Sequence, residues 1–324
     1  MLSLRGFRPL LVLVELTATA ATLSSQELKR LFPDAVPRIS CEASKFTPPR
    51  IPGAVIRIVS ATRQQSSCVV KANVTHPQAG DEVKMAIWLP FENWNGRFLG
   101  RGGGGFSGGF PDSRVAQAEQ GWAAAFTDAG HVSEGGSFAV DTRGKLNWLG
   151  IRNFGHLAIH EMTLVGKNLI EQAYGKAPQY SYFLGCSTGG RQALMEVQRY
   201  PDDYNGVIAG APGINMPKLH AAQLWGQVVM KEANNYLPLC KLDAVEKAAV
   251  ASCDRLDGLA DGIIEEPRAC NFSPQLLIGK SVPSCGVFTD ADASVVKSIM
   301  DGPRRSDGSR LWYGLAPGAG RGSA

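Results

Sequence analysis

The 324-residue sequence has no run of basic residues, and its formal net charge is only +4. Nucleic acid is therefore not a predicted partner, because proteins that bind it gather Lys and Arg into a stripe or patch. No segment has the roughly 20 consecutive apolar residues that a membrane-spanning helix needs, so no membrane partner is predicted either. With 44% hydrophobic residues, the chain can bury one large core or two smaller ones.

The first 25 residues have the order of features found in a secretory signal peptide. Arg5 and Arg8 precede a short apolar run at 10–16, and the small residues ATA follow at 18–20. An ordinary N-terminal helix is the alternative. The seven cysteines stand at positions 41, 68, 186, 240, 253, 270 and 285. An odd count leaves at least one unpaired within an oxidised chain, and both features favour a secreted or periplasmic location.

Strand-like and helix-like segments alternate over residues 26–215. Strands are predicted at 54–60, 68–76, 82–90, 97–99, 121–131, 180–185 and 205–212, and helices at 113–120, 152–174 and 191–200. This alternation predicts an α/β fold with a mostly parallel sheet flanked by helices. Beyond residue 215 two helices follow without a strand between them, so residues 216–324 are predicted to form an insertion or second domain.

A serine stands at the junction between a predicted strand and a predicted helix. The stretch GCSTGG matches G-x-S-x-G at Gly185, Ser187 and Gly189. In this context the motif predicts a nucleophile on a sharp turn, with the N–H of Thr188 as one oxyanion donor. The glycine-rich loop after the strand at 97–99 would supply the second donor, at Gly103 or Gly104. The alternative is a glycine-rich turn without chemistry.

The same loop has a competing interpretation. Gly100, Gly102 and Gly105 spell G-x-G-x-x-G after a strand, and Asp128 follows after a later strand, as in a dinucleotide-binding site. A helix must then begin directly at the glycines to hold the pyrophosphate. Here FSGGFPDS intervenes, which disfavours nucleotide binding.

The sequence has few histidines that could act as a base for the serine. Of the five, only His220 follows Ser187, and it lies in a predicted helix instead of after the further strands that a Ser–Asp–His order requires. His156 and His160 are four residues apart on a helix but lack the glutamate of H-E-x-x-H, so packing or helix-surface roles are predicted for them. His131, at the end of a strand, is predicted to have a structural or substrate-contact role.

An acidic loop suggests a metal site. Asp254, Asp257 and Asp261 lie close together with two glycines, and clustered carboxylates of this kind suit Ca²⁺. An acidic surface turn is the alternative. Cys253 and Cys270 bracket the loop, and a disulfide between them would add roughly 3 kcal/mol of stability.

Five stretches together resemble the tannase and feruloyl esterase family, which includes the mono(hydroxyethyl) terephthalate hydrolases. They are WNGRFLGRGGGG, TDAGH, SYFLGCSTGGRQALMEVQRYPDDYNGVIAGAP, CDRLDGLADGII and DGSRLWYGLAPGA, and the resemblance runs from about residue 46 to 318. It implies an α/β-hydrolase domain with a lid inserted after the strand that ends near Pro212. It also implies serine-dependent hydrolysis of small-molecule esters of aromatic acids, with Ser187 as the nucleophile.

The resemblance also implies roles for other residues. A structural lid Ca²⁺ would be held by Asp254, Asp257 and Asp261 and by the backbone carbonyls of Leu259 and Ile263. Cys253–Cys270 matches a family disulfide, whereas Cys240 and Cys285 are left either unpaired or paired with each other. Cys186 matches one half of a disulfide whose other half follows the catalytic histidine.

Family members are longer, and their catalytic Asp and His lie in the C-terminal part. The resemblance therefore predicts that this chain ends within an incomplete lid, leaves Cys186 a free or mispaired thiol, and is inactive as it stands. The alternative function is a non-catalytic, calcium-stabilised remnant or binding protein.

Overall fold

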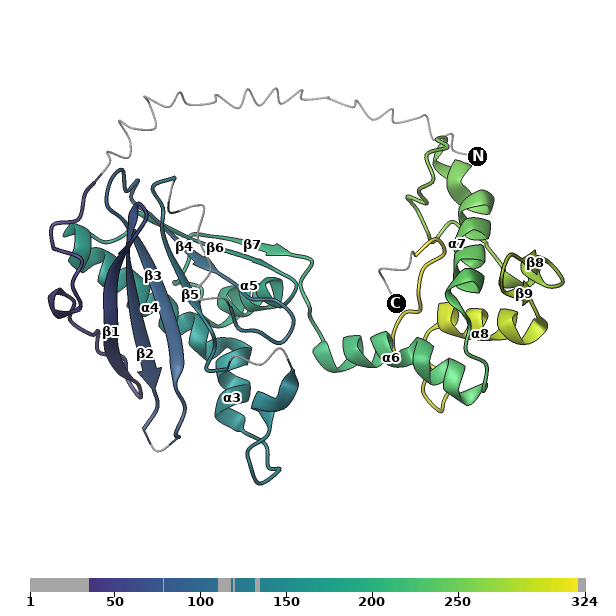
Figure 1. Cartoon of the computed structure of the whole chain (residues 1–324), viewed down its shortest axis with the longest axis horizontal. Helices are drawn as coiled ribbons and strands as arrows, with labels where there is room; N and C mark the ends of the chain where they lie inside the picture. The colour runs from purple at the N-terminus through teal and green to yellow at the C-terminus, as the bar shows by residue number, and fades with distance from the viewer. Residues whose placement is uncertain (1–34, 78, 110–117, 119, 132–134, 320–324) are drawn as a thin grey trace, which may run out of the picture. The chain divides into compact units, whose positions relative to one another are not determined.

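The computed structural model describes residues 35–319 except 78, 110–117, 119 and 132–134. The predicted signal peptide and most of the predicted helix at 113–120 lie outside these residues. The chain divides into two compact units between Pro212 and Gly213, and both can be followed in Figure 1. Within the described residues, no helix is both long and apolar enough to cross a membrane.

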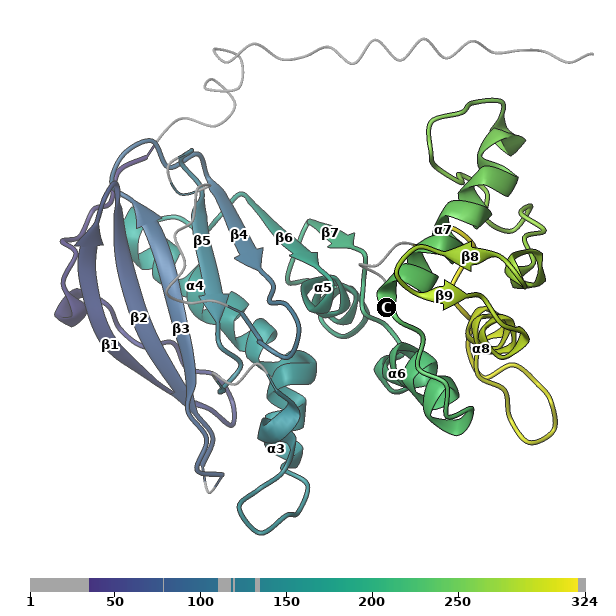
Figure 2. The ribbon, with the colours of Figure 1, turned by 45° about the vertical axis from the view of Figure 1, so that its right-hand side comes forward.

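The first unit is built on a seven-stranded sheet in the order β1-β2-β3-β5-β4-β6-β7. The strands are β1 (Val55–Gln64), β2 (Ser67–Thr75), β3 (Val83–Pro90), β4 (Arg97–Arg101), β5 (Ala123–Thr127), β6 (Tyr180–Cys186) and β7 (Gly206–Gly210). The ladders from β1 through β3 to β5 are antiparallel, whereas β5, β4, β6 and β7 run parallel (Figure 2). The predicted α/β fold is confirmed as a mixed sheet, whose parallel part carries the glycine loop and the serine turn.

One long helical segment packs against this sheet. It consists of α3 (Trp148–Arg152), a π-helical turn η3 (Asn153–Leu157) and α4 (Ala158–Tyr174). The predicted helix start at 152 is too late, because Asn147 accepts a hydrogen bond from Gly150 N–H at 3.1 Å and caps the helix earlier. The predicted end is confirmed at Gly175, whose φ of 69° is the left-handed conformation that closes many helices.

The apolar face of α4 forms the core with the sheet. Its fully buried residues include Ile159, Met162, Val165, Leu169 and Ile170. The next helix, α5 (Thr188–Arg199), contacts β6 and β7. It therefore starts at the carboxyl end of a parallel strand, where α/β proteins place ligands. Two short 3₁₀ turns, η1 (Ala43–Lys45) and η2 (Gly136–Ala139), complete this unit.

The second unit is mainly helical and has its own core. Its elements are α6 (Met216–Glu232), α7 (Leu239–Cys253), η4 (Asp254–Asp257), η5 (Pro274–Leu277), β8 (Ser281–Val282), β9 (Gly286–Val287) and α8 (Asp290–Asp301). Phe288 is fully buried and packs with a cluster that includes Val229, Leu277 and Val296. The two helices predicted from the sequence are confirmed as α6 and α7.

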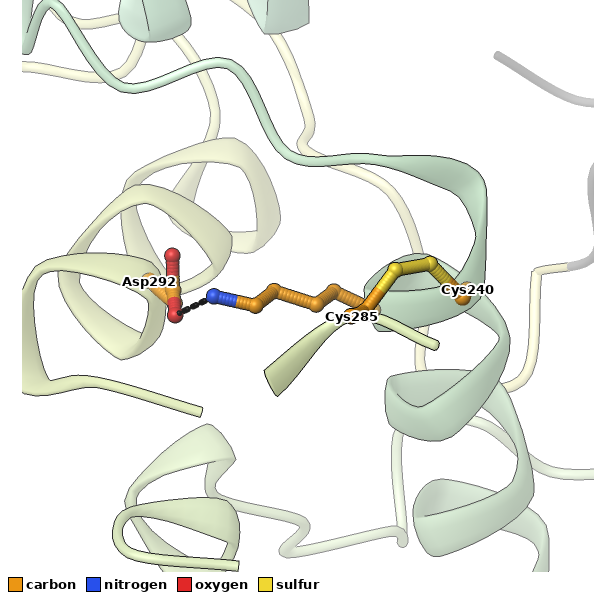
Figure 3. Close-up of a disulfide and its surroundings, with 4 residues drawn as sticks. Cys240, Cys285 and Asp292 are labelled. Atoms are coloured by element: carbon orange, nitrogen blue, oxygen red, sulfur yellow. Dashed lines mark hydrogen bonds and ion pairs between the residues drawn. A yellow bond between two sulfur atoms is a disulfide. The ribbon is translucent and has the colours of Figure 1, made fainter. Parts of the chain in front are cut away.

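Six of the seven cysteines form disulfides. The bonds join Cys41 to Cys68, Cys240 to Cys285 and Cys253 to Cys270. The pair around the acidic loop is the one that the family resemblance implied. Cys240 and Cys285, for which the sequence left two possibilities, are bonded to each other (Figure 3). Cys186 is a free, exposed thiol, as predicted.

Candidate active site at the serine turn

Ser187 occupies a strained backbone position between β6 and α5. Its φ of 59° and ψ of −116° lie in a region that residues with a side chain rarely adopt. Two hydrogen bonds hold the turn: Ser187 N–H donates to Gly210 O at 3.0 Å, and Ser187 O accepts from Arg191 N–H at 3.0 Å. The hydroxyl does not cap the helix, and the residue is exposed. The turn therefore presents the serine oxygen outward, as a nucleophile elbow does.

Glycines are required on both sides of this turn. A Cβ on Gly185 would lie 2.2 Å from the carbonyl oxygen of Gly189, and a Cβ on Gly102 would lie 2.5 Å from Gly189 Cα. Both distances are far below van der Waals contact. The strand, the helix start and the glycine loop can approach this closely only because these side chains are absent.

The glycine loop after β4 is fastened to α5 by a buried glutamine. Gln192 is 0% exposed. Its Oε1 accepts from Gly103 N–H at 2.9 Å, and its Nε2 donates to Gly108 O at 2.9 Å. Sequence analysis did not identify this residue, because a glutamine on an amphipathic helix ordinarily faces solvent and no motif marks it.

The residues predicted to form the oxyanion hole are brought together. Thr188 Oγ1 donates to Gly105 O, and Gly189 N–H donates to Gly103 O at 3.0 Å. Thr188 N–H opens α5 and has no acceptor among the described residues, so it is a free donor at the positive end of the helix dipole. Gly103 N–H is already used by Gln192, whereas Gly104 takes part in a tight turn through its carbonyl, which accepts from Ser107 N–H at 2.9 Å.

The glycine loop does not start a helix. Residues 102–109 form turns and a single bridge before the undescribed residues at 110–117. A dinucleotide site needs the helix to begin directly at the glycines. The loop instead packs against the N-terminus of α5, which belongs to the serine turn, and this geometry argues against nucleotide binding.

All five histidines are described, and each has a partner other than Ser187. His76 contacts Asp81 and Glu161, His131 contacts the carbonyl of Phe106, His156 contacts Tyr200, His160 contacts Asp203, and His220 contacts Gln223. Within the described part of the chain, no histidine forms a hydrogen bond with the nucleophile candidate. Among the described residues, the serine turn and the Thr188 N–H therefore have no histidine hydrogen-bonded to Ser187.

The acidic loop of the second unit is shaped by its own aspartates. One oxygen of each carboxylate accepts backbone N–H groups of the loop: Asp254 from Gly262 at 2.8 Å, Asp257 from Leu259 at 2.8 Å, and Asp261 from Ile263 at 3.0 Å. Among the described residues, the oxygen atoms of these three carboxylates do not all lie within 4.8 Å of one another. The donors are all oxygen atoms, which fits Ca²⁺, but a bound ion would have to draw them together.

The chain is similar in sequence to known proteins of one family. Residues 67–322 match the family model described as tannase and feruloyl esterase. The chain is 37% identical over 304 residues to a probable feruloyl esterase from Arthroderma benhamiae, covering 86% of this chain and 56% of the relative. It is 33% identical over 282 residues to a probable feruloyl esterase B-1 from Aspergillus fumigatus, covering 85% and 51%.

Solved structures agree with these matches. The tannin acyl hydrolase from Aspergillus niger superposes with a TM-score of 0.70 at 28% identity, covering 82% of this chain and 53% of that one. Feruloyl esterase B from Aspergillus oryzae gives a TM-score of 0.70 at 29% identity, covering 86% and 59%. The chain spans about half the length of the curated relatives it matches. From the family match and the sequence identity, the chain belongs to the tannase and feruloyl esterase family.

Proposed function

We propose that this protein is a carboxylic ester hydrolase for small-molecule esters of aromatic acids, with Ser187 as its nucleophile. The observation that carries the proposal is the strained, exposed serine at the start of α5, next to a free backbone donor. The names of the relatives, feruloyl esterase and tannin acyl hydrolase, support the class of substrate.

The chemistry assigns one role to each part of the turn. Ser187 Oγ attacks the ester carbonyl and forms a tetrahedral intermediate, whose negative oxygen is held by the N–H groups of Thr188 and Gly104. The alcohol leaves as the acyl-enzyme forms, and water then releases the acid. The serine proton must pass through a base to the oxygen of the leaving alcohol. A positioned base of this kind accelerates the reaction by about 10²–10⁴-fold. Since each of the five histidines is bonded elsewhere, the 324-residue chain by itself is expected to react slowly.

A serine-directed fluorophosphonate probe tests this proposal. We expect slow labelling of Ser187, located by peptide mapping, and no labelling of that peptide in Ser187→Ala. Without a base, the labelling rate should rise with pH, because hydroxide must remove the serine proton. If wild type and Ser187→Ala are equally unlabelled, the non-catalytic remnant or binding protein becomes the better description. The observation that favours this second candidate is that no described histidine contacts Ser187.

We further propose that Ca²⁺ stabilises the second unit. Asp254, Asp257 and Asp261, with the carbonyls of Leu259 and Ile263, would hold the ion. Its contribution is structural, because all five ligands belong to one loop of the second unit, which the ion would hold together. Chelation with EGTA should lower the melting temperature of wild type, and Asp257→Ala should remove this sensitivity. Asp301→Ala, an exposed change in the same unit outside the loop, should retain it. The calcium site is contradicted if EGTA leaves the melting temperature of wild type unchanged and Asp257→Ala melts at the same temperature as wild type.

A location outside the cytosol is part of the same proposal. Three disulfides form among the described residues, and such bonds persist in oxidising compartments. We therefore place the protein in the secreted or periplasmic class.

A further inference from the structure

Three side chains that could ligate a metal ion, from separate segments, meet at α5, the helix that begins directly after Ser187. They are His160 on α4, Glu196 on α5 and Asp203 in the connection from α5 to β7. One ligating atom from each lies within 4.8 Å of the others. Glu196 is 1% exposed and Asp203 is 6% exposed. The cluster is therefore a buried group of two carboxylates and one imidazole.

The carboxylates of this cluster are poorly compensated. His160 Nδ1 lies 2.7 Å from Asp203 Oδ2, but neither carboxylate oxygen of Glu196 has a hydrogen-bond partner among the described residues. The nearby Lys167 ammonium donates to the backbone carbonyl of Asp203 instead of to a carboxylate. Burial, and after it the neighbouring Asp203 carboxylate, raises the pKa of Glu196 well above its ordinary value. A buried carboxylate without a donor is unfavourable unless a proton or a cation joins it.

We propose that His160, Glu196 and Asp203 form a binding site for a divalent transition-metal ion, with Zn²⁺ as its best-fitting ligand. An imidazole nitrogen with two carboxylates is a donor set that suits Zn²⁺, whereas Ca²⁺ prefers oxygen donors alone. Zinc–ligand bonds of about 2.0–2.2 Å place neighbouring ligand atoms about 3–4 Å apart, so small side-chain rotations are enough.

The surroundings of the cluster provide a route for the ion and indicate what the ion would stabilise. Glu196 also lines a surface pocket with Tyr200, Tyr204 and Asn205, through which an ion and a water ligand could enter. The three ligands tie α4, α5 and the segment before β7 together. Because α5 begins directly after Ser187, a metal ion here would hold in place the helix that starts at the serine turn. The ion would not take part in the ester chemistry.

Sequence spacing does not reveal this site. His160 and Asp203 are 43 residues apart in the chain. The sequence instead suggests the pair His156 and His160. In the fold these two histidines have different partners, because His156 Nδ1 bonds to Tyr200 OH at 2.7 Å.

Isothermal titration of the metal-stripped 324-residue protein with ZnCl₂ tests the proposal. We expect one high-affinity Zn²⁺ per chain in wild type, and binding at least tenfold weaker in Glu196→Gln and in Asp203→Asn. His156→Gln is the matched control on the same helix and should bind as wild type does. Asp257→Ala should also retain the site, which separates it from the acidic loop. CaCl₂ should not displace the bound zinc.

The proposal is overturned if wild type takes up no zinc, or if Glu196→Gln and Asp203→Asn bind it as wild type does. A proton shared by Glu196 and Asp203 would then explain the cluster. Circular dichroism checks that the variants fold. If neither variant folds, the X-ray absorption spectrum of zinc bound to wild type decides. The site requires one imidazole nitrogen and otherwise oxygen ligands around the zinc, and any other set of ligands refutes it.

Discussion

Replacing Asp292 with asparagine should destabilise the second unit by about 2.4 kcal/mol at pH 7. Asp292 is 2% exposed. Its carboxylate lies 2.5 Å from Lys241 Nζ and accepts from Thr289 N–H at 2.7 Å and from Asn235 Nδ2 at 3.1 Å. Figure 3 shows the Asp292 carboxylate in this ion pair, close to the disulfide between Cys240 and Cys285.

The magnitude follows from the proton affinity of Asp292. Burial alone would raise its pKa, but the Lys241 ammonium and the Thr289 and Asn235 donors outweigh burial and lower the pKa from 3.8 to about 2. At about 1.36 kcal/mol for each tenfold change in proton affinity, the charged form is favoured by about 2.4 kcal/mol. Asparagine has the shape of aspartate but lacks this charge. It also leaves the Lys241 ammonium without its counter-ion.

The pH dependence has a definite sign. Because the folded pKa lies below the ordinary value, the stabilisation is complete above about pH 4 and is lost as the pH falls through about 2. The difference between wild type and Asp292→Asn should therefore shrink to about 0.8 kcal/mol at pH 2.5. Urea unfolding at the two pH values measures this change.

Hydrogen exchange provides the local measurement. A loss of about 2.4 kcal/mol corresponds to roughly sixtyfold faster exchange of the protected amides of α8 at pH 7. Asp301→Asn is the control on the same helix: its partner Lys297 is 2.7 Å away, but their side chains are 46% and 55% exposed. Exposed pairs of this kind contribute up to about 0.5 kcal/mol. Equal exchange in wild type and Asp292→Asn, or an equally large effect in the control, would refute the reasoning.

Three further predictions concern the turn, a half-buried histidine and a disulfide. Gly185→Ala should destabilise the first unit by about 1–3 kcal/mol in thermal unfolding and abolish probe labelling, because its Cβ would lie 2.2 Å from Gly189 O. Burial alone would lower the pKa of His76, but its two carboxylate partners raise it, so its stabilisation should be complete below about pH 6.5 and decline above its folded pKa. His76→Gln should flatten that decline in unfolding midpoints measured from pH 5 to 9. Replacing Cys253 and Cys270 with serine should lower the free energy of unfolding by roughly 3 kcal/mol, measured in urea. An unchanged urea midpoint would contradict this prediction.

The parts of the fold that sequence predicted are those set by local rules. Alternating apolar residues identified the strands, and the glycine at 175 identified the end of α4. Ser187 could be found because a sharp strand-to-helix turn requires glycines at fixed spacing around it. The start of the long helix was predicted too late, because Asn147 caps it and a π-helical turn at Asn153–Leu157 shifts the helical period.

The parts that sequence did not predict depend on contacts between distant residues. Gln192 holds the glycine loop through Gly103, 89 residues away in the chain. Nothing in the local pattern around that glutamine distinguishes it from a surface residue. The bond between Cys240 and Cys285 spans 45 residues and could not be chosen over free thiols by counting cysteines. Such contacts are set by how the elements pack, which periodicity does not encode.

The serine turn shows how local and distant requirements combine in one site. The strain at Ser187 is local, but Gly210 O on β7 holds its N–H, and Gly103 O after β4 holds the N–H of Gly189. A strained backbone persists only where the surrounding structure fixes it from several directions. Here the fixing groups come from two parallel strands and α5, all within the first unit. The backbone geometry of Ser187 is therefore set by groups of the first unit, and changes within the second unit, such as Asp292→Asn, should leave it in place.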